Sequence, residues 1–244
     1  GFSSLMQQLP QTETKDSLCI DPDSIGLISP PELVRMPDPQ EVIYACDLTF
    51  GGREAQDNQA IATILRWGSG KEAQFVIQIL DLVEGGALQV PPALINAAAP
   101  MMARYPSAIH RVVLEDAGSA RSLASMGLQF QVQMPVSMYR PRVGKALRAM
   151  QVAPLFESGQ LRARPDCQNL DLLRNDCARL DVHGKVRSAV VGGKRSTSPD
   201  TLDALITGIL SCVEPQRQGL TRIEGLNGVG YSEAERRLGA HRIY

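Results

Sequence analysis

The sequence predicts an α/β domain whose central mixed β-sheet combines an antiparallel meander with parallel strands and is flanked by helices. Three observations predict it. Residues 41–82 hold three apolar runs separated by short turn-like segments, which is typical of a meander. Residues 91–136 alternate helical and extended patterns, which is typical of parallel strands joined by helices. A chain of 244 residues that is 43% hydrophobic can bury one good core.

The expected meander begins with residues 41–48, a nearly continuous apolar run of the kind found in a sheet covered on both faces. Gly51 and Gly52 lie in the loop that follows, and residues 58–67 form the second expected strand. Ser69 and Gly70 mark a tight turn before the third expected strand, residues 73–82. These short connections favour antiparallel pairing.

The rest of the domain is expected to alternate between helices and strands. Helices are expected at residues 91–105, 118–126, 144–156, 170–180 and 199–213, and strands at residues 108–114, 130–136 and 160–163. Pro154 should shorten or kink the helix that contains it. Ser198 is the expected N-cap of the last helix, with Pro199 at its first position. Residues 181–197 are rich in Gly and basic residues and should form a hairpin or a loop.

The chain is expected to divide into three parts. Residues 1–40 hold many Pro, Gln, Asp and Ser residues and little periodicity, which indicates a linker or an arm that wraps the domain. The domain itself is expected at residues 41–213, and residues 214–244 are expected to form a flexible, polar tail. The chain begins with Gly1 rather than Met, which suggests a fragment of a longer chain.

Composition excludes several classes of protein. The formal net charge of −1 gives no global basic surface for nucleic acid, although a nuclease needs only a local basic path. No stretch is long and apolar enough to span a bilayer, and the first residues show no secretory-signal pattern. The cysteines lack zinc-binding spacing, so we expect free thiols in a reducing compartment at Cys19, Cys46, Cys167, Cys177 and Cys212.

Acidic residues stand where the expected elements begin or end. Asp47 closes the first strand, Glu115 and Asp116 follow the fourth, and Asp200 and Asp203 lie in the first turn of the last helix. Carboxylates at the ends of two strands and the start of a helix can meet at one edge of a sheet. Hard oxygen ligands of this kind suit Mg²⁺ or Mn²⁺, and a pair of such ions supports phosphodiester cleavage. The pattern therefore favours a metal-dependent nuclease.

Each acid also has a purely structural interpretation. An Asp after a strand commonly forms a turn or caps a helix, and acids in a first helical turn interact favourably with the helix dipole. Successive strand side chains point to opposite faces, so only one of Glu115 and Asp116 can face a common site. Asp200 and Asp203 lie on one helical face, so both can approach the same ions. Because clustered carboxylates repel one another, a bound cation should stabilise the fold.

Four motifs resemble the large subunit of phage terminases, whose nuclease domain is ribonuclease H-like. Residues 114–123 (LEDAGSARSL) are similar to its strand-to-helix segment. Residues 144–149 (GKALRA) and 154–161 (PLFESGQL) are similar to its K-x-x-R-A and P-L-F-E-x-G stretch. Residues 199–205 (PDTLDAL) are similar to its closing D-D-x-x-D-A-L motif, and residues 2–10 (FSSLMQQLP) to the end of the preceding ATPase domain. The resemblance covers roughly residues 2–212.

The resemblance implies a ribonuclease H-like fold and an endonuclease that cuts concatemeric double-stranded viral DNA during genome packaging. It selects Glu115 rather than Asp116. It implies two Mg²⁺ or Mn²⁺ ions at a catalytic site formed by Asp47, Glu115, Asp200 and Asp203. Implied partners are double-stranded DNA, the portal protein, the terminase small subunit and the ATPase domain of the same polypeptide, all in the cytoplasm of the host cell.

Two residues depart from the family pattern. Pro199 stands where the family has the first Asp of a pair, and Ser198 stands where it often has His. This position therefore carries fewer acids than the pattern. The chain also holds no Walker A phosphate loop, so any ATP-driven motor lies outside these residues.

Basic residues near the expected site are candidates for guiding DNA. Together they would make a path for phosphate groups, although each could also be an ordinary solvated side chain. The candidates are Arg140, Arg142, Lys145, Arg148, Lys194 and Arg195.

Two other functions remain open. Another nuclease of ribonuclease H-like fold, such as a junction resolvase or a transposase, would share the acids and favour branched DNA or transposon ends. A docking module that binds DNA or the portal without catalysis would have kept only the fold. The absence of an acid at Pro199 is the sequence feature that favours this last alternative.

Overall fold

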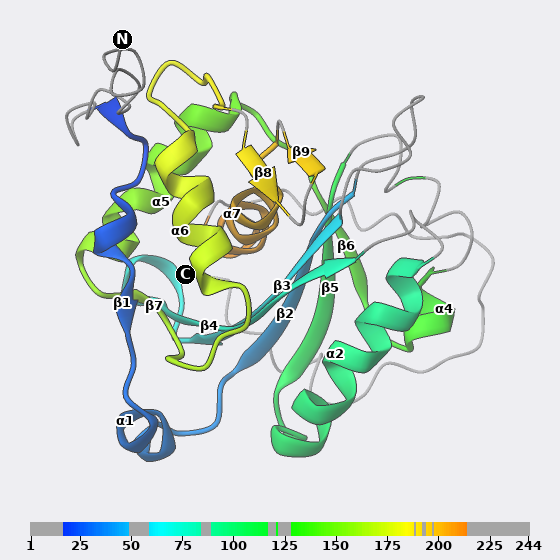
Figure 1. Cartoon of the computed structure of the whole chain (residues 1–244). Coiled ribbons are helices and arrows are strands. Elements are labelled where there is room, and N and C mark those ends of the chain that lie inside the picture. Colours follow the sequence, from blue (N-terminus) through cyan, green and yellow to red (C-terminus); the bar gives the residue numbers. More distant parts are fainter. Residues whose placement is uncertain are drawn as a thin grey trace, which may run out of the picture.

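A seven-stranded β-sheet runs through the molecule, which the computed structural model describes over residues 17–48, 59–83, 89–116, 121, 128–187, 189–191, 194–196 and 198–213 (Figure 1). In chain order the strands are β1 (Gly26–Leu27), β2 (Glu41–Asp47), β3 (Gln59–Trp67), β4 (Gln74–Val83), β5 (Ile109–Glu115), β6 (Val136–Tyr139) and β7 (Leu161–Ala163). Their spatial order is β1-β7-β4-β3-β2-β5-β6.

The sheet is mixed, as the sequence predicts. β3 pairs antiparallel with both β2 and β4, which confirms the meander. β5 pairs parallel with β2, and β6 parallel with β5, while β7 pairs parallel with β4 and with β1. Among the seven strands described, β3 alone runs against the others. The carboxyl ends of β2 and β5 therefore lie next to each other at one edge of the sheet.

Helices cover both faces of this sheet (Figure 1). They are α1 (Pro30–Arg35), α2 (Val90–Arg104), α4 (Leu128–Val132), α5 (Lys145–Glu157), α6 (Leu170–Arg179) and α7 (Asp200–Val213), with short 3-10 helices η2 (Pro22–Ser24) and η3 (Gly70–Glu72). Helices α5, α6 and α7 lie on one side, and α2 and α4 on the other. None of the helices in the described residues is long and apolar enough to cross a membrane.

Two apolar cores, one on each face of the sheet, explain why the sequence of β2 is a nearly continuous apolar run. Ile43 packs on one face with Phe156 of α5 and Ile206 of α7. The next residue, Tyr44, packs on the other face with Leu94 of α2. Because successive strand residues point to opposite faces, a strand between two cores is apolar on both, as β2 is from Val42 to Cys46.

Helix α7 is the most deeply buried helix on its face, and a glycine allows its close approach to the sheet. Every residue from Thr201 to Leu210 is buried. A Cβ atom on Gly208 would lie 2.6 Å from Cδ1 of Ile64 and 2.8 Å from Cβ of Ala45. Such distances are well inside van der Waals contact, so glycine sets how near α7 lies to β2 and β3. This spacing also sets the distance of the α7 acids from the strand ends.

Most expected elements lie within one residue of their expected bounds. This holds for the strands expected at residues 41–48, 58–67, 73–82, 108–114 and 160–163, and for the helices expected at residues 91–105, 144–156, 170–180 and 199–213. A small hairpin, β8 (Ala189–Val191) with β9 (Lys194–Ser196), confirms the hairpin expected within residues 181–197. The helix expected at residues 118–126 and the tail at residues 214–244 lie outside the described residues, Arg121 excepted.

The strand expected at residues 130–136 is wrong. Residues 128–132 form helix α4, and the strand, β6, begins only at Val136. Leu128 and Val132 are four residues apart and both buried, which is a helical spacing that the alternating polar residues obscure. Gln133 then takes a left-handed conformation, with φ of 53°, and this breaks the helix before the strand.

Pro154 does not shorten its helix, since α5 continues to Glu157. Pro154 lies in the last turn and is exposed, as is Met150, whose carbonyl loses the helical hydrogen bond that a proline cannot donate. Water can therefore satisfy that carbonyl, and the helix continues past the proline.

The segment before β2 packs onto the domain over the part that the structure describes. Strand β1 joins the edge of the sheet beside β7, and Ile28 donates its backbone N–H to the carbonyl of Ala163 at 3.0 Å. Ile20 and Ile25 are buried in the core beneath α5 and α6. Residues 17–40 thus contribute a strand and apolar side chains to the domain.

We predict that Gly208→Ala lowers the free energy of unfolding by about 1–3 kcal/mol, because the added methyl group overpacks the contact with Ile64 and Ala45. Urea unfolding followed by circular dichroism would measure this. Gly144→Ala is the control, because a Cβ there has nothing within 4 Å and should cost clearly less. Equal stability of the two variants would contradict the close packing of α7.

Candidate functional site

The first two acids lie together because of the register between β2 and β5. These strands are parallel neighbours, and Cys46 of β2 pairs with Leu114 of β5. The next residues, Asp47 and Glu115, therefore end their strands at the same edge, as expected from the sequence. In Figure 1 both strands run upward, so this edge is at the top of the sheet.

Helix α7 brings the other acids to the same edge. Asp200, Asp203 and Thr207 have the spacing i, i+3 and i+7, which places them on one face of the helix. The Thr207 hydroxyl donates to Oε2 of Glu115 at 3.4 Å, so this face lies against the end of β5. The four carboxylates of Asp47, Glu115, Asp200 and Asp203 are thus brought together.

Two cations from α5 pair with this cluster. Lys145, the first residue of α5, forms an ion pair through Nζ with Oδ2 of Asp203, and Nζ also donates to Oγ of Ser198 at 3.4 Å. Arg148, one turn later, donates from Nη1 to Oε2 of Glu115 at 2.8 Å. The sequence indicated both residues only as candidates for DNA binding. They pair with the carboxylates because α5 packs against α7, a tertiary contact that the sequence did not predict.

Burial raises the pKa values of three of these carboxylates, those of Asp47, Asp200 and Asp203. Burial, followed by the charges of Asp203 and Asp200, raises the pKa of Asp47 well above its ordinary value. Burial raises the pKa of Asp203 to about 6, although the charges of Lys145 and Arg148 act in the opposite direction. Burial also raises the pKa of Asp200 to about 6, against a hydrogen bond from Ser198. These three carboxylates are therefore stabilised by a proton or another cation on their oxygens.

The donor atoms fit a hard divalent cation in type. Asp203 is 3% exposed, yet its Oδ1, like Oδ1 of Asp200, is buried and accepts no hydrogen bond from the residues that the structure describes. Buried carboxylate oxygens without a partner are costly unless a cation or a proton joins them. In the described part of the chain, no three His, Cys, Asp or Glu side chains are arranged so that they could together hold a metal ion. The cations of α5 are the partners of Asp203 and Glu115 instead.

Asp116 takes no part in this cluster. Its Oδ1 accepts a hydrogen bond from Nε of Arg121 at 2.6 Å, and its backbone N–H donates to the carbonyl of Tyr139. The hydrogen bond from Arg121 lowers the pKa of Asp116. Glu115 and Asp116 therefore have different neighbours, as the alternation of strand side chains requires.

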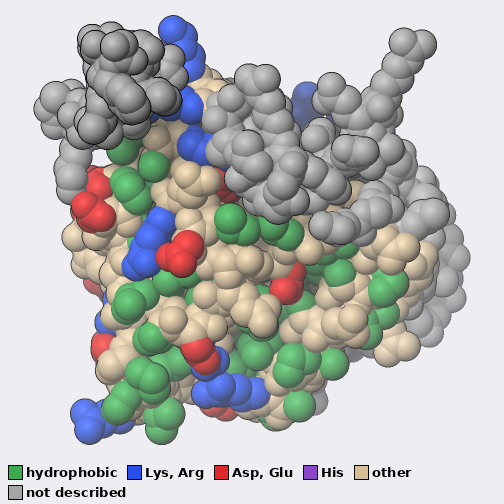
Figure 2. Space-filling model, in the orientation of Figure 1, with side chains coloured by type: hydrophobic (Ala, Val, Ile, Leu, Met, Phe, Trp, Pro, Cys, Tyr) green, Lys and Arg blue, Asp and Glu red, His purple; other side chains and the backbone are tan. Residues whose placement is uncertain are grey.

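Of the remaining basic candidates, Arg140 and Arg142 form none of the ion pairs among the described residues. Arg140 and Arg142 are exposed on the segment between β6 and α5. Lys194 and Arg195 belong to β9, and their side chains lie outside the described part of the structure. On the face drawn in Figure 2, several Lys and Arg side chains lie along the upper margin, whereas acidic and basic side chains are mixed elsewhere.

Asp176 helps to hold the first turn of α7, a role that the sequence analysis did not predict. This buried residue of α6 accepts hydrogen bonds at Oδ2 from the backbone N–H of Thr201, at 3.1 Å, and from the Thr201 hydroxyl, at 2.5 Å. Arg179 donates to its Oδ1 at 3.1 Å. Asp176 therefore caps the first turn of α7, although it comes from another helix. One sequence feature could have indicated this role: Asp176 is an acid on the same helical face as the apolar residues Leu173 and Cys177, which is the buried face of α6.

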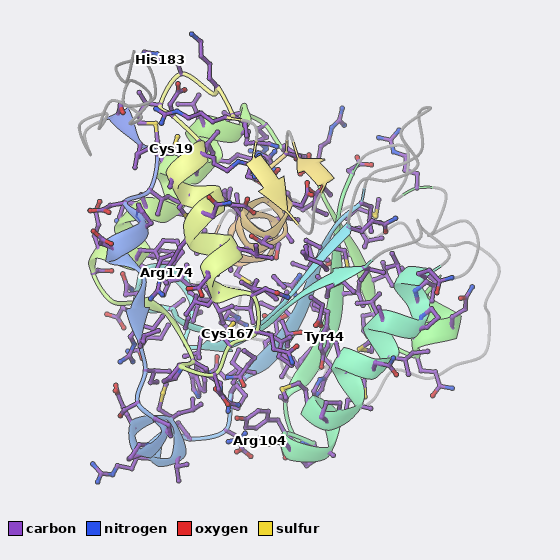
Figure 3. The ribbon with its side chains drawn as sticks, in the orientation of Figure 1. Cys19, Tyr44, Arg104, Cys167, Arg174 and His183 are labelled. Atoms are coloured by element: carbon purple, nitrogen blue, oxygen red, sulfur yellow. The ribbon has the colours of Figure 1, made fainter. Side chains whose placement is uncertain are left out.

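The histidines do not join the acidic site in the residues that the structure describes. His110 accepts or donates at Nδ1 with the Tyr44 hydroxyl, at 2.9 Å, and at Nε2 contacts the carbonyl of Tyr105 at 3.0 Å. Both ring nitrogens of His110 thus have structural partners. His183 lies in the loop after α6, at the outer margin of the molecule and far from Tyr44 in Figure 3.

Comparison with known proteins gives structural matches alone. No protein-family model matches the sequence, and no curated protein sequence matches it. The large terminase nuclease of the thermophilic phage G20c, with bound magnesium, is 14% identical, with a TM-score of 0.43. That match covers 80% of this chain and 97% of the phage G20c chain.

Two further matches come from other phages. The g2p nuclease domain of bacteriophage SPP1, with bound Mn, is 12% identical over 77% of this chain and 93% of its own, with a TM-score of 0.45. The large terminase of a second thermophilic bacteriophage is 9% identical, with a TM-score of 0.49. That match covers 79% of this chain but 43% of the other terminase. All three proteins are large terminases or their nucleases.

We predict that the metal-free protein loses stability as the pH rises from about 4 to about 7 through the contribution of Asp203. Its folded-state pKa of about 6 exceeds the ordinary value of 3.8, so the folded state binds more protons in this window. The stability that Asp203 contributes is fully present below pH 3.8 and is lost as the pH rises through about 6. Asp203→Asn should therefore show a smaller fall in melting temperature across the window. Thermal unfolding in EDTA would measure it, and identical pH profiles for both proteins would contradict the prediction.

Proposed function

We propose that this chain is a divalent-metal-dependent endonuclease of the terminase type, which cuts double-stranded DNA. The single observation that carries the proposal is the convergence of Asp47, Glu115, Asp200 and Asp203 from two strand ends and one helix. Two of these acids present buried oxygens that accept no hydrogen bond from the described residues. Buried acids without such a function would destabilise the fold with no compensating role.

The four carboxylates are the residues that would hold Mg²⁺ or Mn²⁺. When bound, two such ions supply an activated water and stabilise the leaving 3′ oxygen of a phosphodiester. The residues of the chain fix the ligands for this chemistry. Asp47 and Glu115 end neighbouring strands of a rigid sheet, and Asp200 and Asp203 lie on a helix packed tightly against it. Sites on such elements hold their geometry better than sites on loops.

The nucleic acid would be held through its backbone. Arg140 and Arg142 are exposed and lead directly into α5, whose first turn contains Lys145. Arginine pairs well with phosphate oxygens, and backbone contacts carry no sequence information directly. A nuclease with few sequence demands suits the cutting of long concatemers.

The role in genome packaging rests on the motif resemblance at residues 114–123, 144–161 and 199–205. On this proposal the substrate is concatemeric viral DNA in the cytoplasm of the host cell. The working partners are the portal protein, the terminase small subunit and an ATPase domain of the same polypeptide. A junction resolvase or transposase would use the same carboxylates on branched DNA or transposon ends.

One observation favours a second candidate, a docking module without catalysis. Lys145 and Arg148 already pair with Asp203 and Glu115, and the described residues form no ready three-ligand metal group. A domain that had lost its metals would keep its acids neutralised in this way. The two candidates differ in whether divalent ions bind and allow cleavage.

We predict that the chain nicks supercoiled plasmid with Mn²⁺ or Mg²⁺ but not in EDTA. Glu115→Gln should lower the rate at least ~100-fold, because even residues that only support metal ligands cost ~10–100-fold when they are changed. Agarose-gel assays of nicked and linear product would measure the rates. Circular dichroism would verify that the variant is folded.

Asp116→Asn is the matched control, since this neighbouring acid pairs with Arg121 instead of joining the cluster. Its nicking rate should stay within about twofold of the unaltered protein, because no ligand is lost. Equal loss in both variants would contradict the assignment of Glu115. Metal-independent nicking would overturn the proposed chemistry, and absence of both cleavage and metal binding would favour the docking module.

We also predict that replacing Arg140 and Arg142 together by Ala weakens binding to duplex DNA of any sequence. Each lost phosphate contact should reduce the slope of log affinity against log salt by about 1. Fluorescence anisotropy at several salt concentrations in EDTA would measure the slope. An unchanged slope would exclude these two residues from the DNA path.

A further inference from the structure

The two cations of the acidic site are held very differently. The Lys145 side chain is 30% exposed, although it reaches Asp203, whose side chain is 4% exposed. Arg148 shows the opposite arrangement, since its side chain is 7% exposed and its partner Glu115 is 26% exposed. Lys145 therefore reaches inward from solvent, whereas Arg148 is part of the buried wall. Of these two cations, Lys145 is the one that can leave its carboxylate without opening the core.

The contacts of Lys145 are those of a replaceable partner. Its ammonium group joins Oδ2 of Asp203 and Oγ of Ser198, and Oδ1 of Asp203 remains without a hydrogen-bond donor among the described residues. A lysine ammonium is a compact, strongly hydrated charge on a flexible stem, so it returns to water easily. An arginine fork in a buried pair is harder to release.

The charges of the site also favour replacement of the Lys145 ammonium group by a divalent ion. Four carboxylates facing Lys145 and Arg148 leave a formal charge of −2 (four negative and two positive groups) when all are ionised. A divalent ion has twice the charge of an ammonium group, so it gains about twice the Coulomb attraction at equal distance. Each oxygen that an ion takes from Lys145 therefore strengthens its binding.

We propose that Lys145 is an exchangeable stand-in cation, which holds Asp203 in the metal-free site and leaves it when a divalent ion binds. The ammonium group and the ion compete for the same carboxylate, while Arg148 stays on Glu115. This inference rests on the metal site proposed above. It adds that Lys145 opposes metal binding and keeps the carboxylates neutralised until an ion arrives.

The test is the affinity for Mn²⁺ alone, measured by calorimetry at about pH 8, where acids with a pKa of about 6 are ionised. Lys145→Met should bind Mn²⁺ more tightly than the unaltered chain, by roughly 5- to 100-fold, the usual range of coupling between two interacting ligands. Lys145→Arg keeps the positive charge, so it should bind Mn²⁺ more weakly than Lys145→Met does. Lys71→Met removes the same charge from an exposed residue of η3, at the other end of β3, and should leave the affinity unchanged.

A second measurement uses the unaltered chain, so it does not depend on a variant that folds. An amine-reactive reagent and mass spectrometry would give the rate of modification of Lys145 with and without Mn²⁺. Release from Asp203 should raise that rate several-fold, while Lys71 reacts equally in both conditions.

The outcomes separate the two proposals. Tighter Mn²⁺ binding by Lys145→Met, with faster modification of Lys145 on adding Mn²⁺, supports the exchange. Binding of Mn²⁺ by all variants with equal affinity overturns the exchange and leaves the proposed nuclease intact. Weaker binding by Lys145→Met also overturns it, because Lys145 would then assist the ion. Failure of the unaltered chain and every variant to bind Mn²⁺ overturns both proposals.

Discussion

Repulsion among buried carboxylates is the constraint on which the acidic edge of this protein depends. Several negative groups near one another, away from water, cannot stay ionised without nearby cations. Helix α5 supplies them: Lys145 pairs with Asp203, and Arg148 pairs with Glu115. The site thus consists of acids from the sheet and α7, and of counter-charges from α5. Helix α5 therefore has two roles: it neutralises the acids at this edge of the sheet, and it packs against the apolar core.

Helix α7 can present its acids because it is fixed along its whole length. Asp176 caps its first turn, and Gly208 allows its middle to touch β2 and β3. Near its end, Ser211 accepts a hydrogen bond from Arg111 at 3.1 Å, and Arg111 also pairs with Glu41 of β2. Three fixed points leave little freedom for Asp200 and Asp203. These contacts lie away from the site, and they offset the cost of holding carboxylate oxygens that accept no hydrogen bond.

Sequence patterns predicted most of the fold where the local signal was strong. The apolar run of β2 follows from its two cores, and the meander follows from its short turns. Prediction failed where two periods overlap within a few residues: residues 128–132 are helical although their alternation suggests a strand. The shortening expected at Pro154 did not occur, because a proline in the last turn of a helix leaves the rest of the helix intact.

The sequence by itself determined that Asp47 and Glu115 each end a strand, and that Asp200 and Asp203 share a helical face. These are consequences of local periodicity, which the chain carries in every short stretch. Only the tertiary structure decided that Lys145 and Arg148 neutralise those acids and that Asp176 caps α7. Such pairs join residues far apart in the chain. They form because α5 and α6 pack against α7, and no local pattern encodes that packing.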